Sequence, residues 1–379
     1  GNIMNNQKKA AAAATNAITE GIIWRQLLIF FFPIVLGTFF QQLYNTADAM
    51  IVGRFVGKEA LAAVGGSSNQ IINLIIGFFV GISSGATVII AQHYGSRKET
   101  ELSHALHTAI AFSTVSSIFL MGAGYFLAPA LLSMMNTPES MMADSVTYLR
   151  IFFLGILFTF IYNIGSSILR SVGDSKRPLY YLIVCCFLNI GLDLLFVLVF
   201  HMGIAGAAIG SSLAEMVSVI FFIIYTWKRI DCKKYALNIL PKFHGKTLKR
   251  ILNVSVWTMI QNFVSLSTWF MFFLFVEHLG ERSLAIANII RNVSGIPFMI
   301  AMAFASTCGS LVSNLIGAGE QDCVRGTIKQ HIRIGYIFVL PILVFFCLFP
   351  DLILRIYTDI PDLRAASVPS LWVLCSAYL

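Results

Sequence analysis

The chain has 379 residues, of which 57% are hydrophobic and only 12% are charged, and its mean hydropathy is +0.80. So little polar surface cannot cover a water-soluble core of this size, and the composition therefore predicts a membrane protein. The sequence contains no phosphate-binding loop, metalloprotease motif or nucleophile-elbow motif. We therefore expect neither an enzyme nor an ATP-driven pump, and no cofactor beyond a coupling ion.

In chain order, residues 1–23 are expected to form a short cytoplasmic tail, and apolar runs separated by polar residues then predict about ten spanning helices. Nothing alternates with period two, so we expect helices and not strands. The fold class predicted is an all-α polytopic membrane protein. The helices fall near 24–52, 66–92, 103–134, 142–170, 178–200, 203–228, 247–279, 284–316, 327–349 and 364–379.

Basic residues set the predicted orientation. Most of the 26 Lys and Arg residues lie in segments on the same side as the N-terminus, which the positive-inside rule makes the cytoplasmic side of the cell (inner) membrane. The richest segment is the linker 229–246, which would anchor to the anionic lipid surface. The net charge of +8 therefore implies the bilayer as a partner and no nucleic acid.

An internal repeat is the main architectural signal. Gly57-Lys-Glu-Ala-Leu resembles Gly280-Glu-Arg-Ser-Leu, and Tyr94-Gly-Ser resembles Ile316-Gly-Ala about 222 residues later. Copies with an even number of helices share one orientation, which predicts two six-helix bundles related by a pseudo-two-fold axis along the membrane normal. The first lobe would be 24–228 and the second 247–379. The second copy stops inside its fourth helix, so twelve helices are expected in a complete protein, with about ten present here.

Three acids lie well inside predicted helices, where a carboxylate is costly and points to function: Asp48, Asp193 and Glu215. Asn189 precedes Asp193 by one helical turn, and Ser211 lies early in the sixth helix. Two carboxylates in a poorly hydrated pocket repel each other, so the pair could exchange a proton or bind Na⁺ through Asp48, Asp193 and Asn189. Alternatively, Asp48 caps its helix and Glu215 is bonded within its own helix.

Other polar residues interrupt apolar helices. Pro33 removes a hydrogen bond from the first helix and is a candidate hinge, although a static kink that aids packing is an equal alternative. Further residues could line a substrate cavity or join helices through hydrogen bonds, and for an arginine the default is to reach toward the membrane surface. These residues are Gln41, Asn45, Asn163, Gln261, Asn262 and Arg291, and Glu215 is a further candidate for the cavity lining.

The chain resembles the multidrug and toxic compound extrusion family, within the superfamily that also contains lipid-linked oligosaccharide flippases. The segments that carry the resemblance are Leu43-Tyr-Asn-Thr-Ala-Asp-Ala-Met-Ile-Val-Gly, Gly81 to Gly95, Leu169-Arg-Ser-Val-Gly-Asp-Ser-Lys-Arg-Pro and Asn189-Ile-Gly-Leu-Asp. The resemblance implies export of small organic cations or amphipathic drugs in exchange for H⁺ or Na⁺ by alternating access. It also implies a coupling-ion site at Asp48, Asn189, Asp193 and Ser211, with Gln41 beside it and Pro33 as the bending point.

One departure concerns the seventh helix, where a branch of the family has an acidic cation ligand and this chain has Gln261 and Asn262. A second-lobe cation site of that kind is therefore not expected. The nearest alternative is a flippase for lipid-linked oligosaccharides or lipid II, which would favour several arginines in the cavity, whereas only Arg291 is a candidate. A non-transporting scaffold or a channel would leave the group of Asp48, Asn189 and Asp193 unexplained. A monomer is expected.

Overall fold

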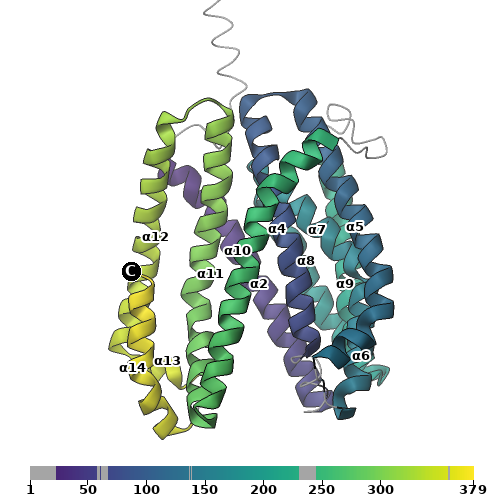
Figure 1. Ribbon diagram of the computed structural model, residues 1–379, viewed down its shortest axis with the longest axis vertical. Helices are drawn as coiled ribbons and strands as arrows, with labels where there is room; N and C mark the ends of the chain where they lie inside the picture. The colour runs from purple at the N-terminus through teal and green to yellow at the C-terminus, as the bar shows by residue number, and fades with distance from the viewer. Residues whose placement is uncertain are drawn as a thin grey trace, which may run out of the picture. The chain divides into compact units, whose positions relative to one another are not determined.

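The computed structural model describes residues 23–57, 60, 67–135, 137, 139–229, 245–356 and 359–379. Nearly all of these residues are helical, and none of them lies in a strand (Figure 1), so the all-α class is confirmed. The predicted tail 1–23 and the predicted linker 229–246 lie almost entirely outside the described residues. The lobe boundaries around that linker stay a prediction.

Every predicted helix overlaps a helix of the structure. Among the described helices, seven are long and apolar enough to span a membrane, and α6 and α7 together form an eighth, bent span. In chain order, the elements are α2 Ile23–Ile51, η1 Val52–Val56, α4 Ser67–Ser96, α5 Glu99–Met134, α6 Glu139–Leu154, α7 Ile156–Ser171, α8 Lys176–Leu194, η2 Leu195–Val199, α9 Gly203–Arg229, α10 Gly245–His278, α11 Glu281–Gly317, α12 Asp322–Leu348, α13 Pro350–Leu354 and α14 Pro361–Ala377.

The predicted helix at 142–170 is wrong in one respect, because Gly155 breaks it into α6 and α7, which meet at a bend of 49°. Gly155 lies directly against Ser212 of α9, and a Cβ at position 155 would approach the Ser212 hydroxyl to 2.9 Å. The bend thus coincides with a point where α9 comes close to this chain segment.

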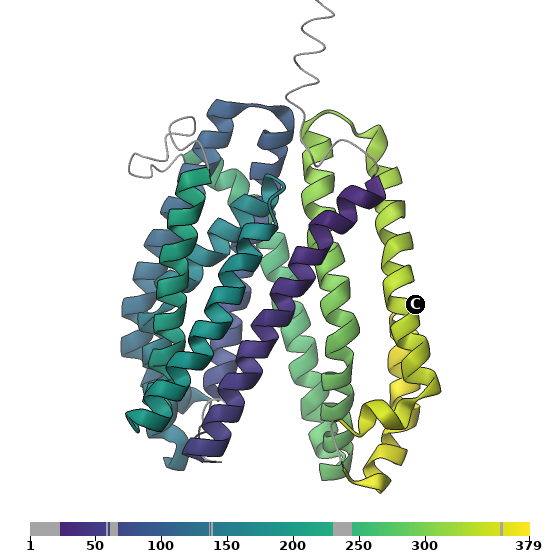
Figure 2. The ribbon, with the colours of Figure 1, turned by 180° about the vertical axis from the view of Figure 1, so that it is seen from behind.

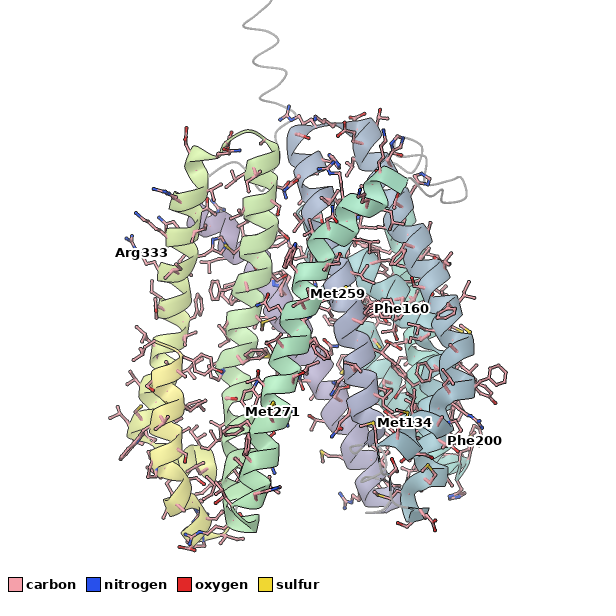
Figure 3. All side chains as sticks on the ribbon, viewed as in Figure 1. Met134, Phe160, Phe200, Met259, Met271 and Arg333 are labelled. Carbon is pink, nitrogen blue, oxygen red and sulfur yellow. The ribbon has the colours of Figure 1, made fainter. Side chains whose placement is uncertain are left out.

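Two compact units divide the chain. Unit 2 contains Phe32–Met259 and Ser313–Gly319, and unit 1 contains the remaining described residues. In unit 2 the largest apolar cluster joins α4, α5, α6 and α7, and Phe160 lies among its buried side chains (Figure 3). In unit 1 the cluster joins α11, α12, α13 and α14 around Val293, Leu343 and Leu371, while Arg333 points away from α12 (Figure 3).

Two π-helical turns end the helices that carry the predicted coupling acids. The turn η1 continues α2 just after Asp48, and η2 continues α8 just after Asp193. The two turns pack together, with Val52 and Val197 buried in one apolar cluster. π-helical turns are rare in proteins, and those that occur often lie at functional sites.

The internal repeat has a counterpart in the structure, which is a reciprocal contact between the end of α4 and the end of α11 (Figure 2). The residues that make this contact all belong to unit 2. A Cβ on Gly95 would collide with the backbone carbonyl of Asn314, and a Cβ on Gly317 would collide with that of Gln92. Gly317 follows Gly95 by 222 residues, and Asn314 follows Gln92 by the same number. The two glycines therefore occupy equivalent places, and each allows the close approach of the other helix.

Candidate functional site

Asn189 and Asp193 lie one turn apart on α8, and both are fully buried, with 1% and 0% of their surface exposed. Neither oxygen of Asp193 and neither polar atom of the Asn189 amide has a hydrogen-bond partner among the described residues. Buried polar groups in proteins are nearly always satisfied. The two side chains therefore have unused capacity for a proton or a cation.

Asp48 of α2 lies close enough to Asp193 for the charges of the two carboxylates to interact. On its other side, the Ser211 hydroxyl of α9 donates a hydrogen bond of 3.4 Å to Asp48 Oδ1. Gly210 lets α9 approach, because a Cβ at this position would lie 2.5 Å from Asp193 Oδ1. The structure thus brings the four predicted coupling residues together from three helices, and their binding of an ion stays a prediction.

Three of these four residues, Asp48, Asn189 and Ser211, border a cavity of about 500 Å³ inside unit 2, and Asp193 lies outside its lining. Its lining includes seven residues that the sequence singled out, namely Gln41, Asn45, Asp48, Asn163, Asn189, Ser211 and Glu215. It also includes polar residues that sequence reasoning missed, namely Tyr44, Asn73, Tyr148, Thr159, Tyr162 and Tyr181. Helical spacing could have revealed some of them, since Tyr44 precedes Asp48 by one turn and Tyr181 precedes Asn189 by two.

Glu215 lies one turn after Ser211 on the same face of α9. Its Oε2 accepts a hydrogen bond of 2.9 Å from the Thr159 hydroxyl of α7, which contradicts the alternative that Glu215 is bonded only within its own helix. The rings of Tyr162 and Tyr181 stack nearby at 3.9 Å between centroids. The cavity therefore has two acidic residues in its lining, Asp48, which neighbours Asp193, and Glu215.

The lining is acidic in character. None of the described residues that border this cavity is a lysine, arginine or histidine. A cavity with carboxylates, amides and aromatic faces and with no positive side chain attracts cations.

The remaining predicted site residues lie elsewhere. Pro33 is buried within α2, which continues as a helix on both sides of it, and its role as a hinge stays a prediction. Gln261 and Asn262 of α10 and Arg291 of α11 belong to unit 1, whereas the cavity belongs to unit 2. That these three residues line a substrate pathway also stays a prediction.

Comparisons with known proteins agree with this architecture. The MatE family model matches residues 33–195 and 258–378. The chain is 31% identical over 344 residues to the probable multidrug resistance protein YpnP of Bacillus subtilis (strain 168), covering 91% of this chain and 76% of that protein. It is 29% identical over 323 residues to the probable multidrug resistance protein YoeA of the same organism, covering 83% of this chain and 69% of that protein.

A solved structure described as MATE in the bent conformation superimposes with a TM-score of 0.86 at 22% identity, covering 96% of this chain and 81% of that one. Fold and relatives together define a multi-span membrane transporter with the pseudo-symmetric 12-helix fold. The chain belongs to the MatE family of multidrug efflux transporters.

Proposed function

We propose that this protein exports small organic cations or amphipathic drugs by exchange for H⁺ or Na⁺. The coupling ion would bind at Asp48, Asn189, Asp193 and Ser211, and the organic substrate would enter the cavity beside them. The relatives YpnP and YoeA are named as probable multidrug resistance proteins, which supports the substrate class. No cofactor is needed for such an exchange.

The observation that carries the proposal is the fully buried Asp193 next to the half-buried Asp48, beside an amide without described partners. Two ionised carboxylates in this place would repel each other, and none of the described residues that line the adjoining cavity is cationic. A proton or a Na⁺ ion held between them would remove the repulsion. Release of that ion on the opposite side of the membrane would then restore it.

The repulsion between the two carboxylates that returns when the ion leaves would favour a change in the conformation of the protein. Asp48 lies on α2, the helix that also contains Pro33, and a proline inside a helix lacks one backbone hydrogen bond. A change of charge at Asp48 would therefore bias the bending of α2. We infer alternating access from this linkage, in a monomer of the cell (inner) membrane with a cytoplasmic N-terminus.

The flippase alternative is less well supported. A pyrophosphate-linked lipid calls for arginine or lysine side chains, and the described cavity lining has none. The acidic and aromatic lining instead suits a positively charged organic compound.

Gradient-driven efflux in proteoliposomes tests the proposal. The full-length protein should move a fluorescent organic cation when a pH or Na⁺ gradient is imposed, and the gradient that works identifies the coupling ion. Asp193→Asn should abolish this movement, because an amide cannot release a proton and binds Na⁺ weakly. Glu139→Gln, at an exposed carboxylate that starts α6, is the matched control and should transport normally.

Full efflux in Asp193→Asn would place coupling elsewhere in the protein. No efflux from the parent under either gradient would reject the exchange mechanism as a whole.

A further inference from the structure

Glu215 is a second acidic group in the cavity, and the proposed coupling site does not use it. It lies on α9 one turn beyond Ser211, the residue that donates a hydrogen bond to Asp48, and both Glu215 and Asp48 line the same cavity. The contacts of Glu215 differ in kind from those of the coupling pair, and this difference indicates what each position binds.

Asp48 and Asp193 are accompanied by the Asn189 amide and the Ser211 hydroxyl. Oxygen-rich surroundings of this kind suit a proton or a small hard cation. Glu215 instead bonds to Thr159, which lies one turn before Tyr162 on α7, and the ring of Tyr162 stacks on that of Tyr181. Aromatic faces attract organic cations, whose charge is spread out and poorly hydrated.

The orientation of Glu215 is fixed by Thr159, whose hydroxyl donates a 2.9 Å hydrogen bond to Oε2 of the carboxylate. This bond uses one of the two oxygens, and none of the described residues that line the cavity carries a positive charge to balance the group. A second polar group beside Glu215 lacks a hydrogen-bond partner among the described residues, namely the hydroxyl of Tyr181, whose ring stacks on Tyr162. Tyr181 is buried, with 4% of its surface exposed. Both features indicate that a ligand completes this part of the cavity.

We propose that Glu215 is the counter-ion for the positive charge of an aromatic cationic substrate, with Thr159 as its positioning residue and Tyr162 and Tyr181 as the stacking surface. This inference rests on the proposed function, and it assigns the charge of the substrate to a different carboxylate from the pair that binds the coupling ion. Substrate and ion would then occupy neighbouring parts of one cavity. Because like charges repel each other, each would weaken the binding of the other.

A matched pair of ligands isolates the contribution of charge. N-methylacridinium and acridine share one set of fused rings, and in mildly alkaline buffer only the first is charged. Fluorescence anisotropy with the purified full-length protein gives both affinities. Glu215→Gln should weaken N-methylacridinium binding by about ten- to a hundredfold, the range expected when a buried charge loses its partner, and should change acridine binding by less than about threefold.

Two further variants make the test secure. Thr159→Val should lower the preference for the cation by about three- to tenfold, because the carboxylate loses its fixed orientation while the rings remain. If Glu215→Gln does not fold, the ratio of the affinities for N-methylacridinium and acridine in Thr159→Val tests the proposal in its place. Glu139→Gln, outside the cavity, should leave both affinities unchanged.

An unchanged preference for N-methylacridinium in the Glu215 and Thr159 variants would overturn the inference, as would an equal loss of both ligands. A loss of cation binding in Asp193→Asn but not in Glu215→Gln would also overturn it, by assigning the substrate charge to the coupling pair. These outcomes are independent of the efflux experiment. Failure of gradient-driven efflux rejects ion exchange and leaves the binding result standing, whereas a failed binding test leaves efflux untouched.

Discussion

A single missing side chain makes room for the Asp193 carboxylate, since a Cβ at position 210 would lie 2.5 Å from its Oδ1. Gly210→Ala should therefore displace Asp193 without removing any charged group. We expect the apparent affinity for the coupling ion to fall by about tenfold, in line with the roughly 1–3 kcal/mol that overpacking costs. The measurement is the efflux rate as a function of pH or of Na⁺ concentration.

Gly191 on α8 supplies the control for this substitution, because a Cβ there would meet nothing within 4 Å. Gly191→Ala should keep the parental ion dependence. Equal ion dependence in the two alanine variants would mean that the position of Asp193 has no influence on coupling.

We expect Ser211 to contribute less to the binding of the coupling ion than Asp48 does. Its bond to Asp48 is 3.4 Å long, near the upper limit for a hydroxyl donor, and such a bond adds about 0.5–1 kcal/mol at most. Ser211→Ala should thus change the apparent ion affinity by less than about fivefold, while Asp48→Asn should abolish coupling in the same efflux assay. A loss as complete in Ser211→Ala as in Asp48→Asn would show that the hydroxyl is itself an essential ligand.

At the scale of residues, the acidic side chains of the site could be predicted from the sequence, but most of the residues that contact them could not. Asn189 and Asp193 could be paired from their spacing, because one helical turn puts them on one face. The partner of Glu215 could not, since Thr159 is 56 residues away and meets it only through the packing of α7 on α9. Tyrosines are common in apolar helices, so the sequence does not indicate which tyrosine rings contact each other.

At the scale of elements, the ends of α4 and α11 depend on Gly95 and Gly317. Each glycine lies so close to a backbone carbonyl of the other helix that no Cβ fits. Alanine at either position should force the helices apart and lower the free energy of unfolding by about 1–3 kcal/mol. An apparent Tm measured in detergent would show the loss.

Gly122 provides the comparison, because it lies in α5 and a Cβ at this position would meet nothing within 4 Å. Gly122→Ala should keep or raise the apparent Tm, since alanine favours helix over glycine by about 1 kcal/mol. Equal melting of all three variants would show that the two glycines are not needed for the contact.

Helix positions could be predicted because apolar runs in a membrane have few other outcomes, but their interruptions could not. The run through 151–158 stays apolar across the break at Gly155, and the break coincides with the close approach of Ser212 from α9. Similarly, the π turns η1 and η2 alter the backbone without altering the hydrophobic pattern. Both features arise from contacts between helices that are distant in sequence.

At the scale of the whole molecule, the number of spans determines on which side each loop lies. Glu139 begins α6 and Cys323 lies at the start of α12, and both are exposed. If α6 with α7, α8, α9, α10 and α11 each cross the membrane once, these two positions face opposite sides. The positive-inside rule adds that Cys323 is cytoplasmic and position 139 is external.

A membrane-impermeant maleimide applied to intact cells and to inverted vesicles tests this arrangement. Glu139→Cys should add label in cells, and Cys323→Ser should remove label in inverted vesicles, each relative to the parent. Labelling of both positions from one side would mean that one of these helices, such as α10, does not span, or that α6 and α7 enter and leave on the same face. Labelling on opposite sides but in the reverse sense would keep the number of spans and invert the protein, so that the ion and substrate sites would face the other way.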